Sequence, residues 1–203
     1  MQKKITAAIL AGGPGSRMNG VVKPNLLLGQ ETILTRTLDV LKDIFNEIIL
    51  VTNTPEHFIQ YKGYSITADH YKGKGPIGGI HAALKASTGD AVFVFAGDMP
   101  FLSSELILKQ SDLFHELDCE ILVPRIGSSI EPLHSVYRRS MLKFLEEYME
   151  SSESYAVRDF FLKRDVKFMD LNNEMREIFS NINFPSDIPE IERIIKKEKH
   201  ETF

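Results

Sequence analysis

The chain has 203 residues, a formal net charge of −4 and one cysteine, and 43% of its residues are hydrophobic. This length fits one α/β domain with a buried core, and the acidic balance excludes a general nucleic-acid binder. Because one cysteine cannot form an intramolecular disulfide, and neither a signal peptide nor a membrane-spanning apolar run is visible, we expect a cytoplasmic protein without a membrane partner.

The first predicted element is a buried strand at residues 5–10, and a glycine-rich segment follows it. From Leu10 to Lys23 the chain contains four glycines, one arginine and one lysine. Glycines let backbone N–H groups approach an anion closely, and Arg17 and Lys23 can bind phosphate oxygens. The segment therefore predicts a polyphosphate cradle, with a flexible charged surface loop as the alternative.

Two common glycine motifs do not fit this segment. A dinucleotide fingerprint requires a third glycine where Met18 stands, and a P-loop requires Ser or Thr where Pro24 follows Lys23. A nicotinamide-dependent oxidoreductase is therefore disfavoured.

Strands and helices then alternate. A helical stripe at 32–45, with Thr32 as its N-cap, precedes a buried strand at 48–51. A ligand would bind beyond the carboxyl ends of parallel strands, so Asn53 is placed to contact a base or ribose, or is only a turn residue.

The next predicted strand, 64–68, ends at Asp69, for which a solvated turn is the alternative role. A glycine-rich segment at 72–80 follows, and then a helix around 82–84. The small Gly78 allows this helix to pack close to the loop or to a nucleotide.

The most apolar strand, 91–96, is expected at the centre of the sheet, and it runs into Gly97-Asp98-Met99-Pro100. A carboxylate at such a strand tip is well placed to bind Mg²⁺, which prefers carboxylates together with substrate phosphates and water. Asp98 is therefore the predicted metal ligand, a turn or cap residue being the alternative.

With a helix at 103–114 and a strand at 119–123, this alternation predicts a doubly wound, mostly parallel α/β sheet flanked by helices. Beyond Pro124 the sequence predicts a polar turn at 125–131 and strands at 132–137 and 166–171. It also predicts helices at 140–149, 155–161 (capped by Ser154) and 186–199.

The motif Leu-Ala-Gly-Gly-x-x-x-Arg-Met-x-x-x-x-Lys at 10–23 resembles the signature of nucleotidyltransferases, and most closely that of the molybdenum cofactor guanylyltransferases. Further similarities are Gly-Asp-Met-Pro at 97–100, Pro-Leu-x-x-x-Tyr at 132–137 and Asn-x-Asn-x-Pro-x-Asp at 181–187. Asn19 and Val22 depart from the family, which usually has glycine and an acid at these positions.

This resemblance implies a Rossmann-like nucleotidyltransferase domain over 1–203, with a nucleotide-binding part at 1–124 and an acceptor-facing part and C-terminal helix at 125–203. It implies transfer of GMP from GTP to the phosphate of molybdopterin, release of pyrophosphate, a Mg²⁺ cofactor and transient contact with cofactor-delivery proteins. Arg158 is an acceptor-phosphate candidate or an ordinary exposed arginine.

The predicted site residues fall into three overlapping groups. The catalytic residues are Arg17, Lys23 and Asp98, and the metal ligands are Asp98 and Asn183, the latter sharing one side of a predicted strand with Asn181. The nucleotide-binding residues are Leu10, Ala11, Gly12, Gly13, Gly15, Arg17, Lys23, Asn53, Asp69, Gly78 and Asp98.

Two alternatives remain open, the first within the same superfamily and the second from another class. One is a cytidylyltransferase, or another enzyme that transfers a nucleotide to a small phosphate. A second is a non-catalytic nucleotide-binding module, which the departures at Asn19 and Val22 favour and the intact Arg17, Lys23 and Asp98 oppose.

Overall fold

The structure is a computed structural model and describes residues 4–12 and 22–201. Its centre is an eight-stranded sheet in which long hydrophobic runs form the buried strands. The strand order is β10 (Val166–Asp170), β7 (Ile121–Ile126), β9 (His134–Arg138), β6 (Ala91–Ala96), β1 (Ile5–Leu10), β4 (Ile48–Val51) and β5 (Ser65–Thr67), with β8 (Ser129–Ile130) paired to β7.

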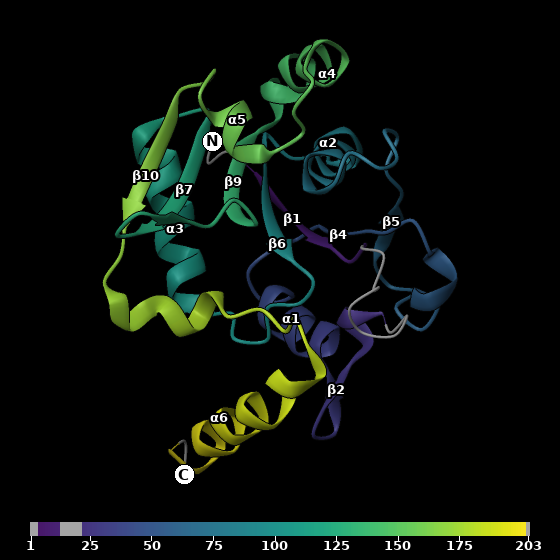
Figure 1. Cartoon of the computed structure of the whole chain (residues 1–203), viewed down its shortest axis with the longest axis vertical. Helices are drawn as coiled ribbons and strands as arrows, with labels where there is room; N and C mark the ends of the chain where they lie inside the picture. Colours follow the sequence, from purple (N-terminus) through teal and green to yellow (C-terminus); the bar gives the residue numbers. More distant parts are fainter. Residues whose placement is uncertain (1–3, 13–21, 202–203) are drawn as a thin grey trace.

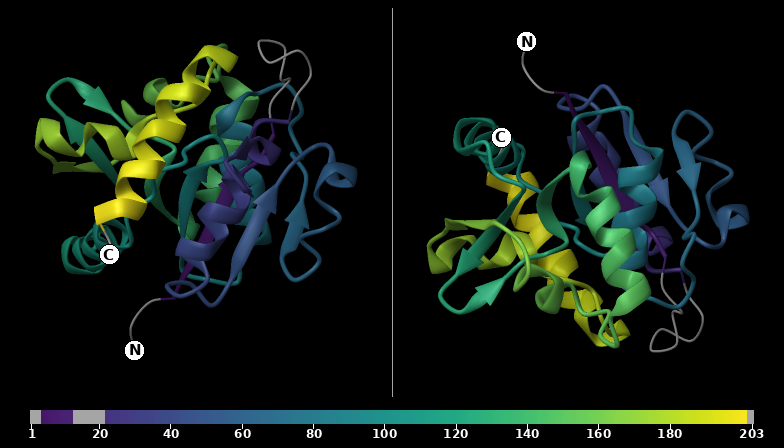
Figure 2. Two further views of the ribbon diagram at one scale, coloured as in Figure 1. Left: turned by 90° about the horizontal axis from the view of Figure 1, so that it is seen from below. Right: turned by 90° about the horizontal axis from the view of Figure 1, so that it is seen from above.

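Helices cover both faces of this sheet. One hydrophobic cluster joins the sheet to α1 (Ile33–Leu41) and α3 (Ser104–Leu117). A second cluster joins the opposite face to α2 (Pro76–Ala86), α4 (Leu142–Ser151) and α5 (Val157–Phe161). Figure 1 shows α2 and α4 on one side of β6, β1 and β4 and α1 on the other, and Figure 2, seen from above, shows α2 and α4 side by side over β1.

Short elements connect and extend these layers. The 3₁₀ turns are η2 (Lys23–Asn25), η3 (Pro55–Phe58), η4 (Arg139–Met141), η5 (Asn173–Phe179) and η6 (Pro185–Asp187). A small hairpin of β2 (Leu27–Leu28) and β3 (Glu31–Thr32) packs against α6 (Ile188–Glu201), and the two lie together at the bottom of Figure 1.

The winding of the sheet reverses at β1. Strands β4 and β5 lie on one side of β1, whereas β6 and the later strands lie on the other. Strands β1, β4, β5 and β6 are parallel, so their carboxyl ends share one edge, and β9 enters antiparallel between β6 and β7. In an open α/β sheet such a reversal point is where ligands bind.

The predicted doubly wound, mostly parallel fold is confirmed, and the strands 5–10, 48–51 and 91–96 have the predicted bounds. Thr32 is the N-cap of α1, and its side chain accepts the N–H of Thr35. Among the described residues, no helix has the length and apolar character needed to cross a membrane.

Four local predictions were wrong. The polar turn predicted at 125–131 is a hairpin, in which β7 runs to Ile126 and β8 pairs with it. Helix α2 begins at Pro76 and not near residue 82, since proline at the first helical position needs no N–H partner. The Asn181–Asn183 segment is not a strand but an irregular connection between η5 and η6. Ala156, and not Ser154, is the N-cap of α5, although the Ser154 hydroxyl accepts the Ala156 N–H at 3.3 Å.

Candidate functional site

Three side chains from distant parts of the chain meet at the carboxyl edge of the sheet. The Lys23 ammonium lies 2.8 Å from Asp98 Oδ2 and donates to Asn183 Oδ1 at 3.1 Å. The Lys23 and Asp98 side chains are 23% and 22% exposed, so the pair is accessible to a ligand and partly shielded from water. We call these three residues the Lys–Asp–Asn cluster.

Gly97 brings Asp98 against the end of β1. Its N–H donates to Leu10 O at 3.1 Å, and a Cβ at this position would lie 2.8 Å from that oxygen and 2.9 Å from Pro24 Cγ. Any larger residue would therefore separate the strand end that carries Asp98 from the turn that carries Lys23.

Asn183 is positioned by its backbone neighbours. The N–H of Ile182 donates to Asp98 O at 3.1 Å, so this segment adds directly to the end of β6. On the other side, the Asn183 and Phe184 N–H groups both donate to Asp187 Oδ2 at 2.9 Å. These backbone hydrogen bonds hold the pKa of Asp187 below its ordinary value, which keeps the carboxylate ionised and the turn closed.

A second polar pair lies across the ends of β4 and β5. Asn53 Nδ2 donates to Asp69 Oδ2 at 2.9 Å, and the Asp69 N–H donates to Asn53 Oδ1 at 3.1 Å. A Cβ on Gly78 would lie 3.0 Å from Tyr71 O and 3.8 Å from Asp69 Oδ2. The structure thus brings Asn53, Asp69 and Gly78 together on the β4–β5 side of the reversal point.

The end of β1 lies between these two groups. Ala11 donates its N–H to Val51 O at 2.8 Å. Gly12 is exposed, and a Cβ added to it would lie 3.8 Å from Thr52 Cα. The backbone here is therefore open to a ligand on the side away from β4.

Several predicted phosphate-binding residues lie outside the described residues. They are Gly13, Gly15 and Arg17, and the family departure at Asn19 is outside as well. Val22 is described: it is half-buried and packs against the hydrophobic cluster beneath α1. The position where the family has an acid is therefore apolar in this chain.

The oxygen atoms of Asp98 and Asn183 converge on one cation, and hard oxygen donors of this kind suit Mg²⁺. Within residues 4–12 and 22–201, no group of three or more His, Cys, Asp or Glu side chains is close enough to hold a metal. The donor set therefore fits an ion that takes one or two protein oxygens and completes its shell with substrate phosphates and water.

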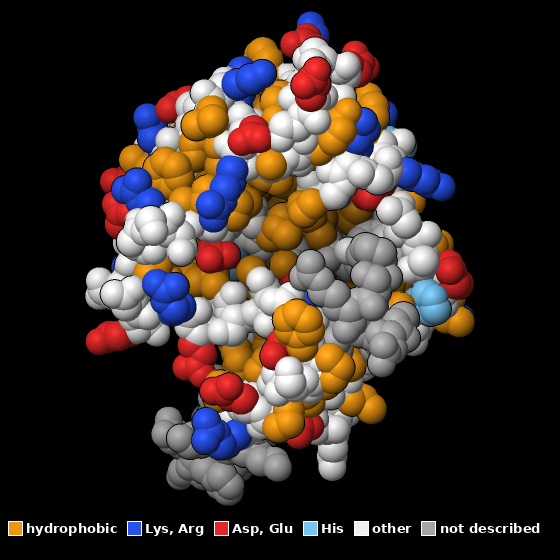
Figure 3. Space-filling view, in the orientation of Figure 1, with side chains coloured by type: hydrophobic (Ala, Val, Ile, Leu, Met, Phe, Trp, Pro, Cys, Tyr) orange, Lys and Arg blue, Asp and Glu red, His pale blue; other side chains and the backbone are white. Residues whose placement is uncertain are grey.

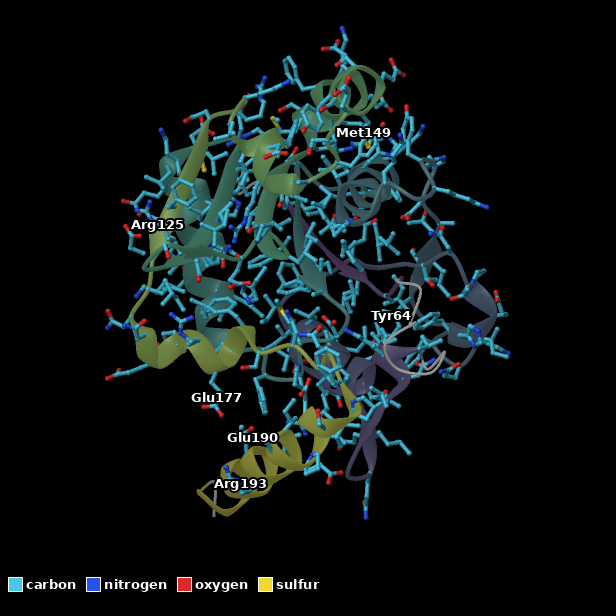
Figure 4. The ribbon with its side chains drawn as sticks, viewed as in Figure 1. Tyr64, Arg125, Met149, Glu177, Glu190 and Arg193 are labelled. Carbon is cyan, nitrogen blue, oxygen red and sulfur yellow. The ribbon has the colours of Figure 1, made fainter. Side chains whose placement is uncertain are left out.

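A cavity of about 370 Å³ is lined in part by residues 100–103, which follow Asp98. No member of the Lys–Asp–Asn cluster lines it. Its lining includes Arg36, Phe101, Glu174 and Glu177, and Figure 4 shows Glu177 on the side of η5 that faces α6. The polar groups at the reversal point lie outside this cavity.

The face seen in Figure 3 is hollowed between α2 and α5, and hydrophobic side chains are visible inside the hollow. Partly buried residues that pack on the cluster beneath these helices include Leu10, Tyr71, Ile130, Leu133 and Tyr155. The sequence assigned Ile130 and its neighbour Glu131 only to a polar turn, because nothing local shows that β8 and β9 return this turn to the carboxyl end of β6.

A sheet of this order, with polar side chains gathered beyond its reversal point, is the arrangement of the nucleotidyltransferase fold class. A sequence model of the MobA-like NTP transferase domain matches residues 7–166, and the chain belongs to this family.

Named relatives agree with this assignment. A probable molybdenum cofactor guanylyltransferase of Peptoclostridium acidaminophilum is 34% identical, over 96% of this chain and 91% of the relative. Another, from Clostridium perfringens strain SM101, is 31% identical over 96% and 88%. The crystal structure of molybdopterin-guanine dinucleotide biosynthesis protein A from Archaeoglobus fulgidus has a TM-score of 0.80 and 25% identity, covering 95% of this chain and 99% of that one.

Proposed function

We propose that the protein transfers GMP from GTP to the phosphate of molybdopterin, with Mg²⁺ as cofactor, and releases pyrophosphate. The observation that carries this proposal is the Lys–Asp–Asn cluster at the reversal point of the sheet. The names of relatives that align over nearly the whole chain supply the nucleotide and the acceptor.

The reaction forms a bond between an acceptor phosphate oxygen and the α-phosphorus of GTP, and it breaks the bond from that phosphorus to the pyrophosphate. A phosphate nucleophile is already ionised at neutral pH, so the chain needs no general base. Its residues act by positioning the two phosphates and by offsetting charge.

Lys23 is suited to this task because an ammonium has three N–H donors. Two of them are directed to Asp98 and Asn183, and the third is available for a phosphate oxygen. Arg17 and the backbone of the glycine-rich segment are proposed to hold the remaining triphosphate oxygens. Asp98 and Asn183 would hold Mg²⁺, which when bound offsets the charge that develops on phosphate oxygens.

The two sides of the reversal point are proposed to bind the two substrates. The Asn53–Asp69 pair and Gly78 lie on the β4–β5 side and would contact the nucleotide. The β9–β7 side, built by β7 and the chain beyond residue 124, would receive the acceptor. Asn183 is the exception to this division, because it returns from the second part of the chain to the central cluster.

The first test is thermal unfolding with GTP, CTP, ATP or UTP, each with and without Mg²⁺. A ligand that binds only the folded state stabilises it by about 2.7 kcal/mol at a concentration of 100 times its Kd. We expect the largest stabilisation with GTP and Mg²⁺ together. Incubation of the protein with GTP, Mg²⁺ and molybdopterin should then yield pyrophosphate and the guanine dinucleotide in equal amounts, measured by chromatography and mass spectrometry.

A preference for CTP would retain the chemistry and replace the product with a cytosine dinucleotide. Stabilisation by GTP without any product would indicate a nucleotide-binding module. Absence of stabilisation by all four nucleotides would contradict the proposal.

A further inference from the structure

Glu131 lies in the turn that joins β8 to β9 beside the carboxyl end of β6, the strand that leads to Asp98. Strand β9 runs antiparallel to β6 with His134 opposite Phe95, and the Ala96 N–H donates to Leu133 O at 2.9 Å. The His134 N–H donates to Glu131 O at 3.1 Å, so residues 131–134 form a turn that ends this register and holds Glu131 beside the carboxyl end of β6. A backbone hydrogen bond from the Glu131 N–H to Pro124 O, at 3.1 Å, and a side-chain hydrogen bond from the Ser135 hydroxyl to Glu131 O, at 2.6 Å, fix the turn in this place.

The Glu131 carboxylate is half-buried and unpartnered. Among the described residues, no hydrogen bond or ion pair reaches it, although Arg158 and Arg176 are close enough to act on its charge. Burial raises the pKa of Glu131 despite the opposing effect of these two arginines. Burying a carboxylate without hydrogen-bond donors costs free energy. A ligand that supplies N–H groups would offset this cost.

The surroundings of Glu131 suit a flat heterocycle. Ile130, which precedes it, and Leu133, two positions later, are partly buried and pack, as Tyr155 does, on the hydrophobic cluster beneath α2, α4 and α5. Tyr155 adds an aromatic ring, one face of which lies against Lys74 Nζ at 3.6 Å from the ring centroid. An apolar wall, an aromatic face and one acid are the elements of a ring-binding site with a single polar anchor.

We propose that Glu131 selects the acceptor by accepting two hydrogen bonds from the 2-amino-4-oxopyrimidine edge of its pterin, one from the ring N3–H and one from the 2-amino group. This inference rests on the proposed function, because that function makes the acceptor a pterin. A carboxylate has two oxygens that can accept such a pair of parallel hydrogen bonds.

Guanine carries the same pattern of N–H donors as the pterin. The choice between these two rings as the partner of Glu131 therefore depends on the side of the sheet on which Glu131 lies. The Asn53–Asp69 pair lies beyond β4 and β5, whereas Glu131 lies on the opposite side of β6, beside β9. A nucleotide on the first side and an acceptor on the second meet at the Lys–Asp–Asn cluster, and Glu131 then faces the acceptor.

The experiment compares 6-hydroxymethylpterin with 6-hydroxymethyllumazine, in which a carbonyl replaces the 2-amino group. Both rings are fluorescent, and the chain has no tryptophan to interfere. The protein, Glu131→Gln, Glu131→Asp and the exposed control Glu116→Gln are titrated with each ring at pH 7. GTP affinity and thermal unfolding are measured on the same samples.

We expect the unsubstituted protein and Glu116→Gln to prefer pterin by about tenfold or more, because the lumazine carbonyl faces a carboxylate. Glu131→Gln should lose or reverse this preference, since its amide accepts from N3–H and donates to the lumazine carbonyl. Glu131→Asp should keep the preference with weaker binding, and it tests the proposal if the Gln variant does not fold.

Three results would overturn the inference. The first is an unchanged pterin preference in Glu131→Gln, and the second is a loss of GTP affinity in place of pterin affinity, which would assign Glu131 to guanine. The third is no pterin binding by a protein that binds GTP. Failure to bind GTP would instead contradict the proposed function, so the two failures are distinguishable.

Discussion

At the scale of single residues, the site combines positions that are close in space and far apart in the chain. Lys23 and Asn183 are separated by 160 positions, and Lys23 and Asp98 by 75. Each residue alone has an ordinary local role, as a turn lysine, a strand-end acid or a loop amide. Their shared position beside the end of β1 is what suits them to the proposed chemical role.

Replacing Asp98 with alanine should lower turnover by about 10³-fold, because the substitution removes the carboxylate that would hold the metal. The Lys23–Asp98 pair is partly exposed, so the free energy of unfolding should fall by only about 1 kcal/mol. Turnover and thermal unfolding measure the two effects, with the exposed Asp112→Ala as control. Full activity of the Asp98 variant would contradict its assigned role.

Gly12 and Gly97 should separate ligand binding from folding. At Gly12 a Cβ meets only ordinary contacts, at 3.8 Å and beyond, so Gly12→Ala should fold normally and lose GTP affinity. At Gly97 a Cβ would lie 2.8 Å from Leu10 O, so Gly97→Ala should lower both stability and affinity. Thermal unfolding and GTP titration of both variants, beside the open-surface control Gly63→Ala, check this contrast. Equal behaviour of the two variants would argue against it.

The local motifs carry enough information to nominate Lys23 and Asp98, because a glycine-rich segment after a buried strand and an acid at a strand tip have direct physical meanings. They do not carry the geometry of Asn183. The alternation of two asparagines predicts a strand, yet the segment is held by the Ile182 N–H on Asp98 O and by the Asp187 carboxylate. These are long-range and turn contacts that periodicity cannot show.

At the scale of elements, α6 and the β2–β3 hairpin support the site from outside the main sheet. A separate hydrophobic cluster joins Leu28 and Ile33 to Ile182, Ile191 and Ile195. The Gly29 N–H also donates to Glu192 Oε1 at 3.1 Å. Because Ile182 belongs to this cluster and precedes Asn183, the packing of α6 and the position of Asn183 are linked.

Ile191→Ala should therefore affect both stability and binding. Ile191 is 5% exposed, and truncation of such a side chain costs about 2–4 kcal/mol of unfolding free energy. We also expect weaker GTP binding at a temperature where the variant is still folded, because Ile182 loses a neighbour. Urea unfolding and GTP titration give the two values. Ile59→Ala, at a residue that is 65% exposed, is the control and should change stability by less than about 0.5 kcal/mol.

The sequence predicts the elements well where one residue pattern decides them. The apolar runs of β1, β4 and β6 and the cap Thr32 are of this kind. It predicts less well where packing decides. The predicted helix began only near residue 82 because Gly78 and Gly79 precede it, but both glycines are buried residues of α2. Gly79 packs against the Leu10 side chain, a contact that no local pattern reveals.

At the scale of the whole molecule, stability should depend on acid through His134. The imidazole is fully buried, with the rings of Phe93, Phe95 and Phe179 edge-on at 5.1–5.3 Å. Its Nδ1 lies 3.2 Å from Gln110 Oε1. Burial lowers the pKa of His134 from 6.5 to about 4, so the neutral form is the folded form.

Because the folded pKa is below the unfolded one, the unfolded state binds the extra proton first. The stability from neutral His134 is full above pH 6.5 and is lost as pH falls towards 4. Between pH 7 and pH 4.5 the loss should be about 2–3 kcal/mol. Urea unfolding at several pH values measures it, and His134→Phe should show a shallower decline. An equal decline in the variant would assign the acid sensitivity to other groups.

The hydrogen bond between Lys23 and Asn183 also bears on the order in which the protein becomes functional during its synthesis. The glycine-rich segment leaves the ribosome before Asp98. The amide that completes the cluster is made more than 80 residues later. We therefore expect a nascent chain to gain full nucleotide affinity only after residue 183 has emerged and α6 has docked, so that an incomplete chain does not sequester GTP.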